Sequence, residues 1–426
     1  MRRTQMLIAV TAGAAVALAG CGRESDSGGD AAPATGEEIS TEEVGGEIDI
    51  WAMGAEGEKL PELAKEFEAA NEGVTVNVTA IPWDSAHDKF VTSITAGTTP
   101  DLAMVGTTWM GEFAGRLDAL DPTPASIDTS VFFEGAQSTT EVGGTSYGVP
   151  WYVETRLVYY RTDIAEKAGH TEVPTDWEGF KTMAADMQSK GGSEWGISLQ
   201  PGGTGSWQTV LPFAWTNGAE VSADDAYTFD TPEMTEAVQY YQSFFTDKIA
   251  DTKPVADELI ANFTSGDEPM FISGPWMRSL VEDTGGEGFV DKYDVAPVPM
   301  PEGGSSASFV GGSNLAVFKD TDNRDTAWAF VQWLTEPETQ ISWYETTTDL
   351  PSVQSAWDDE ALTSDPKLAA FGTQLETAQA PPSFPTWEEV VTSFDTAIEQ
   401  VTKTGADPSE VLQGVQSQAE SIGTGQ

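Results

Sequence analysis

The stretch GEIDIWAMGAEGEKLPELAKEFEAANEGVTVNVTAIPWDSAHDKFVTSITAGTTPDLAMVG, residues 46–106, alternates short apolar runs with longer amphipathic segments. The apolar runs at 46–54, 74–82 and 100–106 are typical of buried strands. Between them, apolar side chains recur at helical spacing, and Asp84 is placed to cap the second helix. This β-α-β-α-β order predicts an α/β fold with a parallel sheet and helices on its faces.

The loops after these strands are the first candidates for a ligand site, because parallel sheets bind ligands at the carboxyl ends of their strands. These loops are residues 53–57, 81–84 and 106–109, and a helix is expected over 108–117.

A second unit follows the first along the chain. Residues 148–169 predict a strand that leads to a helix, and residues 173–191 predict a helix capped by Thr175 or Asp176. The Gly- and Ser-rich residues 300–318 predict a loop or crossover followed by a strand. Further helices are expected at 231–245, 326–344 and 386–405, with a shorter one after Asp407.

The single cysteine, Cys21, lies after a basic start and an apolar run of 13 residues, 6–18. That run is shorter than the roughly 20 residues of a membrane span, so residues 1–20 predict a signal peptide. Leu18-Ala19-Gly20-Cys21 resembles the bacterial lipobox and predicts lipidation of Cys21; the alternative is a secreted protein with an incidental cysteine. Residues 21–46 are Gly, Ser, Ala, Pro and acid, which predicts a flexible acidic tether.

Size and charge narrow the function classes. The 426 residues carry 69 Asp and Glu against 20 Lys and Arg, for a net charge of −49. Such a chain repels phosphate backbones, so no nucleic acid partner is expected. The part beyond the tether is long enough for two domains.

Enzyme signatures are weak. There are two histidines, His87 and His170, and the sequence contains neither HExxH nor a P-loop, so no metal or cofactor is predicted. Gly144-Thr-Ser-Tyr-Gly148 fits G-x-S-x-G, but an extended, proline-interrupted segment follows it where a nucleophile elbow needs a helix. This match is interpreted as a hairpin turn.

The aromatic residues are more informative. Of 14 tryptophans, Trp328 and Trp333 lie on an amphipathic segment and are expected in the core. Others fall in predicted loops: Trp83, Trp109, Trp151, Trp207 and Trp276. Aromatic walls with a few fixed polar groups suit the binding of sugar rings.

Five segments in order (49–71, 148–169, 270–280, 309–319 and 344–351) resemble the extracellular sugar-binding lipoproteins of ABC importers, similar in plan to maltose-binding protein. The resemblance implies a two-lobed periplasmic-binding-protein-like fold, each lobe a mainly parallel sheet flanked by helices, joined by hinge crossovers. Lobe 1 would comprise 47–152 and 307–355, and lobe 2 would comprise 153–306 and 356–426.

The resemblance also implies a set of ligand-binding residues. Trp276 matches the main stacking platform, Glu56 and Glu154 match acceptors of sugar hydroxyls, and Thr107 and Thr108 fall where the family often has Asn or Asp. Arg156 could pair with Glu154 or bind a ligand carboxylate. The full expected set is Glu56, Asp84, Thr108, Trp151, Tyr152, Glu154, Trp207, Trp276, Gly312, Ser313, Trp343, Tyr344, Asp349 and Trp387.

The expected function is therefore capture of a di- or oligosaccharide by a monomer, lipid-anchored on the outer face of the cell membrane, and its delivery to an ABC permease. The sequence leaves two alternatives open: a secreted carbohydrate-active enzyme, and an importer protein for a non-sugar ligand such as a peptide or polyamine.

Overall fold

A computed structural model describes residues 36–40, 44–254 and 258–426, all of which belong to one compact unit, Pro33–Gln426. The predicted signal peptide, Cys21 and the greater part of the predicted tether lie outside these residues. The described end of the tether makes defined contacts, since Gly36 donates to the carbonyl of Thr123 and the carbonyl of Glu37 accepts from Arg324. Across the described ranges, the helices are too short or too polar to span a bilayer.

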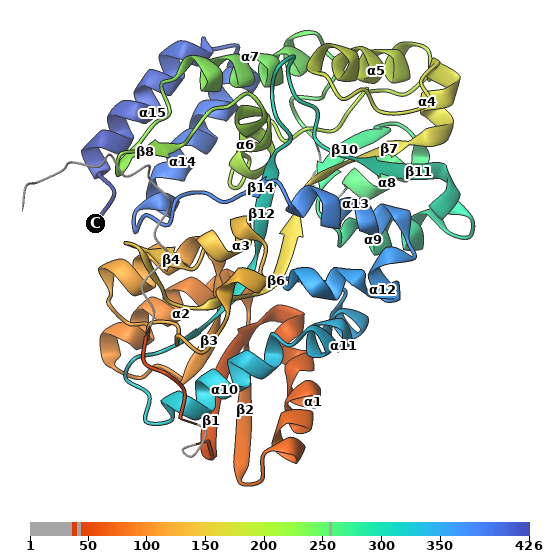
Figure 1. The fold of residues 1–426 in the computed structure, drawn as a ribbon. Helices are drawn as coiled ribbons and strands as arrows, with labels where there is room; N and C mark the ends of the chain where they lie inside the picture. Colours follow the sequence, from red (N-terminus) through yellow and green to blue (C-terminus); the bar gives the residue numbers. More distant parts are fainter. Residues whose placement is uncertain (1–35, 41–43, 255–257) are drawn as a thin grey trace, which may run out of the picture. The chain divides into compact units, whose positions relative to one another are not determined.

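The first lobe is built on a mixed sheet with strand order β13-β6-β12-β3-β1-β2, and β14, which follows α13 of the second lobe, pairs with the first two residues of β12 (Figure 1). Strands β1, β2 and β3 are parallel, as the sequence predicts, whereas β12 runs antiparallel to both β3 and β6. Its elements are β1 (Gly46–Met53), α1 (Gly54–Ala70), β2 (Val74–Ile81), α2 (Trp83–Ala96), β3 (Leu102–Gly106), η1 (Thr107–Trp109), η2 (Gly111–Arg116), η3 (Thr129–Val131), α3 (Glu134–Ser138), β4 (Glu141–Val142), β5 (Thr145–Ser146), β6 (Val149–Thr155), β12 (Ser308–Val317), α10 (Arg324–Leu334), α11 (Pro337–Thr347) and β13 (Leu350–Pro351).

The turn from β1 into α1 places the first helical residues directly beside the sheet. Gly54 has φ +56°, a left-handed conformation that glycine adopts without strain, so the helix begins as soon as the strand ends. The helix therefore starts at Gly54, within residues 53–57 that were expected to form a loop, and carries Glu56 in its first turn.

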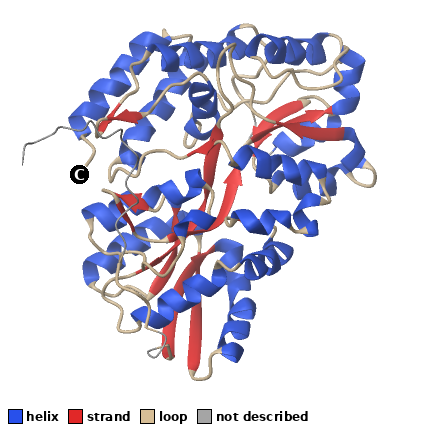
Figure 2. Cartoon of the chain, in the orientation of Figure 1, coloured by secondary structure: helices blue, strands red, loops and turns tan. Residues whose placement is uncertain are grey.

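The second lobe has a three-stranded sheet of order β10-β7-β11 surrounded by helices (Figure 2). Both pairings in this sheet are antiparallel, so the expectation of a mainly parallel sheet is wrong for this lobe. Its elements are β7 (Leu157–Arg161), α4 (Thr162–Ala168), α5 (Trp177–Ser189), α6 (Trp207–Thr216), β8 (Ser222–Ala223), β9 (Ala226–Tyr227), α7 (Pro232–Thr246), α8 (Leu259–Ser265), β10 (Met270–Ser273), α9 (Met277–Gly285), η5 (Phe289–Lys292), β11 (Tyr293–Ala296), η6 (Gln354–Asp358), α12 (Glu360–Thr363), α13 (Pro366–Leu375), β14 (Ala378–Gln379), α14 (Trp387–Glu399), η7 (Gln400–Thr404) and α15 (Pro408–Ile422).

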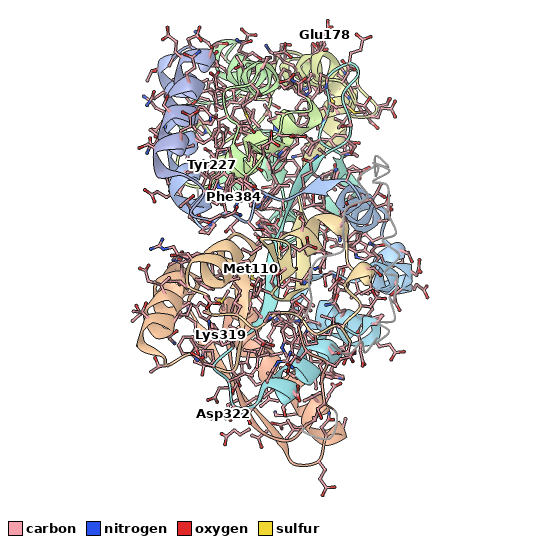
Figure 3. All side chains as sticks on the ribbon, turned by 60° about the vertical axis from the view of Figure 1, so that its left-hand side comes forward. Met110, Glu178, Tyr227, Lys319, Asp322 and Phe384 are labelled. Carbon is pink, nitrogen blue, oxygen red and sulfur yellow. The ribbon has the colours of Figure 1, made fainter. Side chains whose placement is uncertain are left out.

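Each lobe has its own buried core. One large cluster draws on β1–β3, α1, α2 and α10, and another on α5, α6, α7, α14 and α15. A third cluster packs β7, β10 and β11 against α13. In Figure 3, Phe384 lies between Tyr227 and Met110, and its ring packs edge-on against Tyr227. Ser383, the residue before Phe384, lies so close to Gly111 that a side chain at Gly111 would collide with the Ser383 carbonyl. The lobe boundaries given above remain a prediction.

The chain passes between the lobes along extended segments. β6 belongs to the first sheet, and after Arg156 the chain continues as β7 of the second sheet. The Gly-rich segment that was expected to be a loop or crossover is largely strand, because β12 covers Ser308–Val317. Gly311 and Gly312 lie within it, directly before a register shift at Ser313 and Asn314.

Three local predictions are also corrected. Asp84 lies in the first turn of α2 and makes no cap hydrogen bond, Pro82 being the residue at the cap. The helix expected over 108–117 is a 3₁₀ turn followed by a π-helix, and residues 326–344 form two helices instead of one. The Gly144–Gly148 match, interpreted as a hairpin turn, begins in the turn between β4 and β5 and continues as the second strand of that hairpin. Asp176, one of the two expected caps, caps α5.

Candidate functional site

A cavity of about 370 Å³ collects residues from both lobes and from the strands that join them. Glu56 reaches it from the first turn of α1, Glu154 from β6, and Trp276 from the loop after β10. This cavity, called the cleft pocket below, is lined by Glu56, Trp83, Tyr152, Val153, Glu154, Pro275, Trp276, Gly312, Thr347, Thr348, Asp349 and Leu350.

Two indole rings form walls of the cleft pocket. Trp83 and Trp276 are each 39% exposed, and they are the two tryptophans among the exposed large apolar side chains of the described residues. Because an exposed indole forgoes the burial that stabilises most tryptophans, two such rings in one cavity indicate a binding surface.

Close backbone approach fixes both rings. A side chain at Gly54 would lie 2.8 Å from Trp83 Nε1, and one at Gly274 would lie 2.0 Å from the Trp276 ring, so each indole rests against a glycine. Tyr159 donates a hydrogen bond of 2.7 Å to the carbonyl of Gly274 and thereby holds the loop that carries Trp276.

Arg156 supports Trp276 from the side of the second lobe. Its guanidinium carbon lies 4.6 Å from the centre of the Trp276 ring, within cation–π range. Its Nη2 also donates to Glu154 Oε1 at 3.1 Å and to Gln208 Oε1 at 2.8 Å. Arg156 therefore forms the ion pair with Glu154, which was the alternative to its binding a ligand carboxylate.

Three carboxyl groups face the cleft pocket: Glu56, Glu154 and Asp349. Burial raises the pKa of Asp349 to about 7, and the neighbouring Glu56 carboxylate adds to the rise. Burial also raises the pKa of Glu154, which the Arg156 guanidinium partly offsets. The pKa of the Tyr152 hydroxyl is raised by burial and by the Glu56 and Asp349 carboxylates. Proton acceptors therefore dominate the polar lining.

A second cavity of about 660 Å³ lies in the second lobe. Arg156 lines this cavity and stacks on Trp276, which lines the cleft pocket. The second cavity is lined by Arg156, Ser198, Leu199, Gln200, Pro201, Gly202, Gly205, Gln208, Thr209, Thr252, Lys253, Pro254, Leu259, Phe271, Ile272, Ser273 and Lys403.

Of the expected site residues, the structure brings six together at the cleft pocket: Glu56, Tyr152, Glu154, Trp276, Gly312 and Asp349. Tyr344 is half-buried and lines a small neighbouring cavity. Asp84 is exposed and Thr108 half-buried, and the lining of the cleft pocket includes neither.

The remaining five expected residues are buried in the packing of the lobes. Trp151 and Trp343 stack on one another with ring centres 4.8 Å apart, and Trp207 packs edge-on against Trp387 at 5.4 Å. Ser313 is fully buried and donates to the carbonyl of Val105. These residues shape the scaffold and present no surface to the cleft pocket.

Trp83 is the main lining residue that was missing from the expected set. The sequence carried a signal for it, because it follows Pro82 at the carboxyl end of β2, where it is the first residue of α2. Thr347 and Thr348 come with the turn between α11 and β13, where Thr348 adopts a left-handed φ of +68°.

Fold and site together define a ligand-binding protein, and the chain belongs to the family of bacterial extracellular solute-binding proteins, whose model matches residues 52–341. It is similar to the sugar-binding protein MalE from the phytopathogen Xanthomonas citri, with 30% identity, a TM-score of 0.82, and coverage of 88% of this chain and 97% of the other. The likeness extends the two-lobed fold to nearly all of the described chain.

Two curated relatives are also named as binding proteins. A putative binding protein of Brucella abortus is 27% identical over 372 residues, which is 86% of this chain and 90% of the relative. The maltotriose-binding protein of Pyrococcus abyssi is 25% identical over 375 residues, 84% of this chain and 78% of the relative. Because the family and these relatives are binding proteins, the chain is a binding protein and not an enzyme.

Proposed function

We propose that the protein binds a di- or oligosaccharide in the cleft pocket and delivers it to an ABC permease. The observation that carries the proposal is the pair of exposed indoles, Trp83 and Trp276, in one cavity with three carboxyl groups. Indole faces pack on the C–H faces of sugar rings, and carboxylates accept hydrogen bonds from sugar hydroxyls. The names of the relatives from X. citri and P. abyssi support a sugar as the ligand.

The second cavity supports a ligand of more than one ring. Arg156 in its lining contacts Trp276 of the cleft pocket, so a chain of sugar units would run past this pair to the amides and hydroxyls of Gln200, Gln208 and Thr209. If the importer protein bound a polyamine, few accessible aromatic side chains would be expected in the cleft, whereas both exposed tryptophans lie there.

Delivery to the permease would follow from closure of the lobes around the sugar. The site draws on both lobes, so a bound ligand stabilises the closed arrangement over the open one by its differential contacts. Anchoring through a lipid on Cys21 and a monomeric state complete the proposal; both rest on the sequence argument.

The test is isothermal titration calorimetry on the chain from Glu47 onward, against neutral and acidic oligosaccharides of two to four rings. We expect one-to-one binding without turnover. Trp276→Ala should weaken binding by about 1–3 kcal/mol, the contribution of a stacked aromatic ring.

Two control variants sharpen this test. Trp276→Phe keeps a ring and should retain most of the affinity, and Leu280→Ala removes an exposed apolar side chain that does not line the pocket. Equal affinities for wild type and Trp276→Ala would rule out this stacking role.

A further inference from the structure

The lining of the cleft pocket is acidic. It contains Glu56, Glu154 and Asp349, and no Lys, Arg or His among the described residues that line it. Arg156, outside the lining, pairs with Glu154. Lys59, also outside the lining, donates to the carbonyl of Thr346 at 2.6 Å, and its charge lowers the pKa of Asp349 less than burial and Glu56 raise it. Glu56 and Asp349 thus face the pocket as two carboxyl groups with no cation in the lining itself.

One carboxylate oxygen in this pocket, Glu154 Oε2, is buried and lacks a hydrogen-bond partner among the described residues. The Asp349 carboxyl differs, because Thr347 and Trp343 lie close enough to lower its pKa as hydrogen-bond donors. A buried acceptor without a partner is costly, so Glu154 Oε2 marks a position where a ligand supplies a donor. The donor must come from a group that fits between the Trp83 and Trp276 walls.

A hydroxyl and a protonated amine would both satisfy this oxygen, but they differ in charge. A hydroxyl forms the hydrogen bond and leaves the charge of the pocket unchanged. A protonated amine offers two or three N–H donors and cancels part of the charge, and the indole faces attract the same cation. The charge imbalance therefore favours the amine.

Resting on the proposed function, we propose that the cleft pocket selects a sugar unit that carries a protonated amine, such as a 2-amino-2-deoxyhexose within a di- or oligosaccharide. The amine lies between Glu56, Asp349 and the free oxygen of Glu154, and the sugar ring packs on Trp276.

A titration follows from the same geometry. Asp349 faces Glu56 and Lys59 from α1 and Tyr152 and Glu154 from β6, and its pKa is raised to about 7. Below that pH the free protein holds a proton on Asp349, and an ammonium group bound beside it favours the ionised form. Binding of the amine at pH 6.5 therefore releases a proton, whereas binding of a neutral sugar does not.

The experiment compares matched sugars by calorimetry at pH 6.5, below the pKa of about 7 of Asp349. The probes are α- and β-linked disaccharides of glucosamine, N-acetylglucosamine and glucose, each titrated in two buffers of different ionisation enthalpy. We expect the glucosamine disaccharide to bind at least tenfold more tightly than its neutral counterparts of the same linkage, with proton release.

Two variants separate charge from fold. Asp349→Asn keeps the side-chain shape and removes the charge, so the preference for the amine should fall to within about twofold while neutral sugars still bind. Glu58→Gln removes one exposed acid of α1 that does not line the pocket, and the preference should persist.

The outcomes distinguish this proposal from the function on which it rests. Equal or tighter binding of the neutral sugars overturns the amine preference and leaves sugar binding intact. A preference that Asp349→Asn leaves unchanged overturns the assigned position of the amine. No heat with any disaccharide overturns sugar binding itself, and the amine proposal with it.

Discussion

At the scale of single residues, Asp349 combines a defined position with an altered ionisation. It follows the left-handed Thr348 at the end of α11, and its backbone N–H donates to Thr347 Oγ1 at 3.1 Å. This turn fixes the carboxyl group in the cleft pocket beside Glu56, where burial raises its pKa from 3.8 to about 7. The energetic consequence is present even without a ligand.

Because the unfolded chain loses the Asp349 proton near pH 4 and the folded chain keeps it until about pH 7, this group lowers stability progressively as pH rises through that window. Asp349→Asn should therefore gain in melting temperature relative to wild type between pH 4 and pH 7, by a few degrees, and level off above. Thermal unfolding at intervals of half a pH unit measures this. Asp320→Asn, at an exposed position, serves as the control. If the melting temperatures of wild type and Asp349→Asn changed in parallel with pH, the prediction would be contradicted.

Residue identity alone could not separate the tryptophans that bind from those that pack. Trp276 and Trp83 both follow strands and remain exposed, but Trp151, inside β6, and Trp387, at the start of α14, are fully buried. What divides them is the partner ring: Trp151 lies against Trp343 and Trp387 against Trp207, pairings between segments far apart in the sequence. Such distant contacts leave no trace in local spacing.

At the scale of elements, β12 shows why the glycines of residues 300–318 favour a loop or crossover before a strand. Gly311 and Gly312 weaken the strand pattern, yet the strand requires them, because a side chain at Gly312 would lie 2.1 Å from the carbonyl oxygen of Tyr152. Gly312 also has φ +115°, which other residues rarely adopt. The β-α-β-α-β order of the first lobe could be predicted because its apolar periodicity is local.

Gly312→Ala should destabilise the protein by roughly 1–3 kcal/mol through backbone strain and the collision with β6. The matched control is Gly414→Ala on α15, where the added methyl group meets nothing within 4 Å. Because alanine is the better helix former, that variant should gain about 0.5–1 kcal/mol. Urea unfolding measures whether each substitution lowers or raises the free energy of unfolding. An unchanged free energy of unfolding for Gly312→Ala would show that β12 relaxes around the methyl group.

At the scale of the whole molecule, the excess of 69 acidic over 20 basic residues is the dominant electrostatic feature. Repulsion within a net charge of −49 opposes the compact state. The Debye length shrinks from about 30 Å at 0.01 M salt to about 10 Å at 0.1 M, so added salt screens this repulsion.

The melting temperature should therefore rise by several degrees when NaCl increases from 0.01 M to 0.5 M at pH 8. Differential scanning calorimetry measures the rise, and KCl at equal ionic strength should give the same shift if screening is the cause. A melting temperature that falls with salt would mean that attractive ion pairs outweigh the net repulsion.

The place of β12 in the first sheet has a further consequence, for the order of events during synthesis. β3 pairs with β12 on the side away from β1, and β12 comes more than 200 residues after β3 in the chain. A growing polypeptide thus exposes an unpaired edge of β3 until its later part leaves the ribosome. The first lobe is synthesised first, but its sheet cannot be completed before most of the second lobe has been made. This order keeps the nascent chain from folding early.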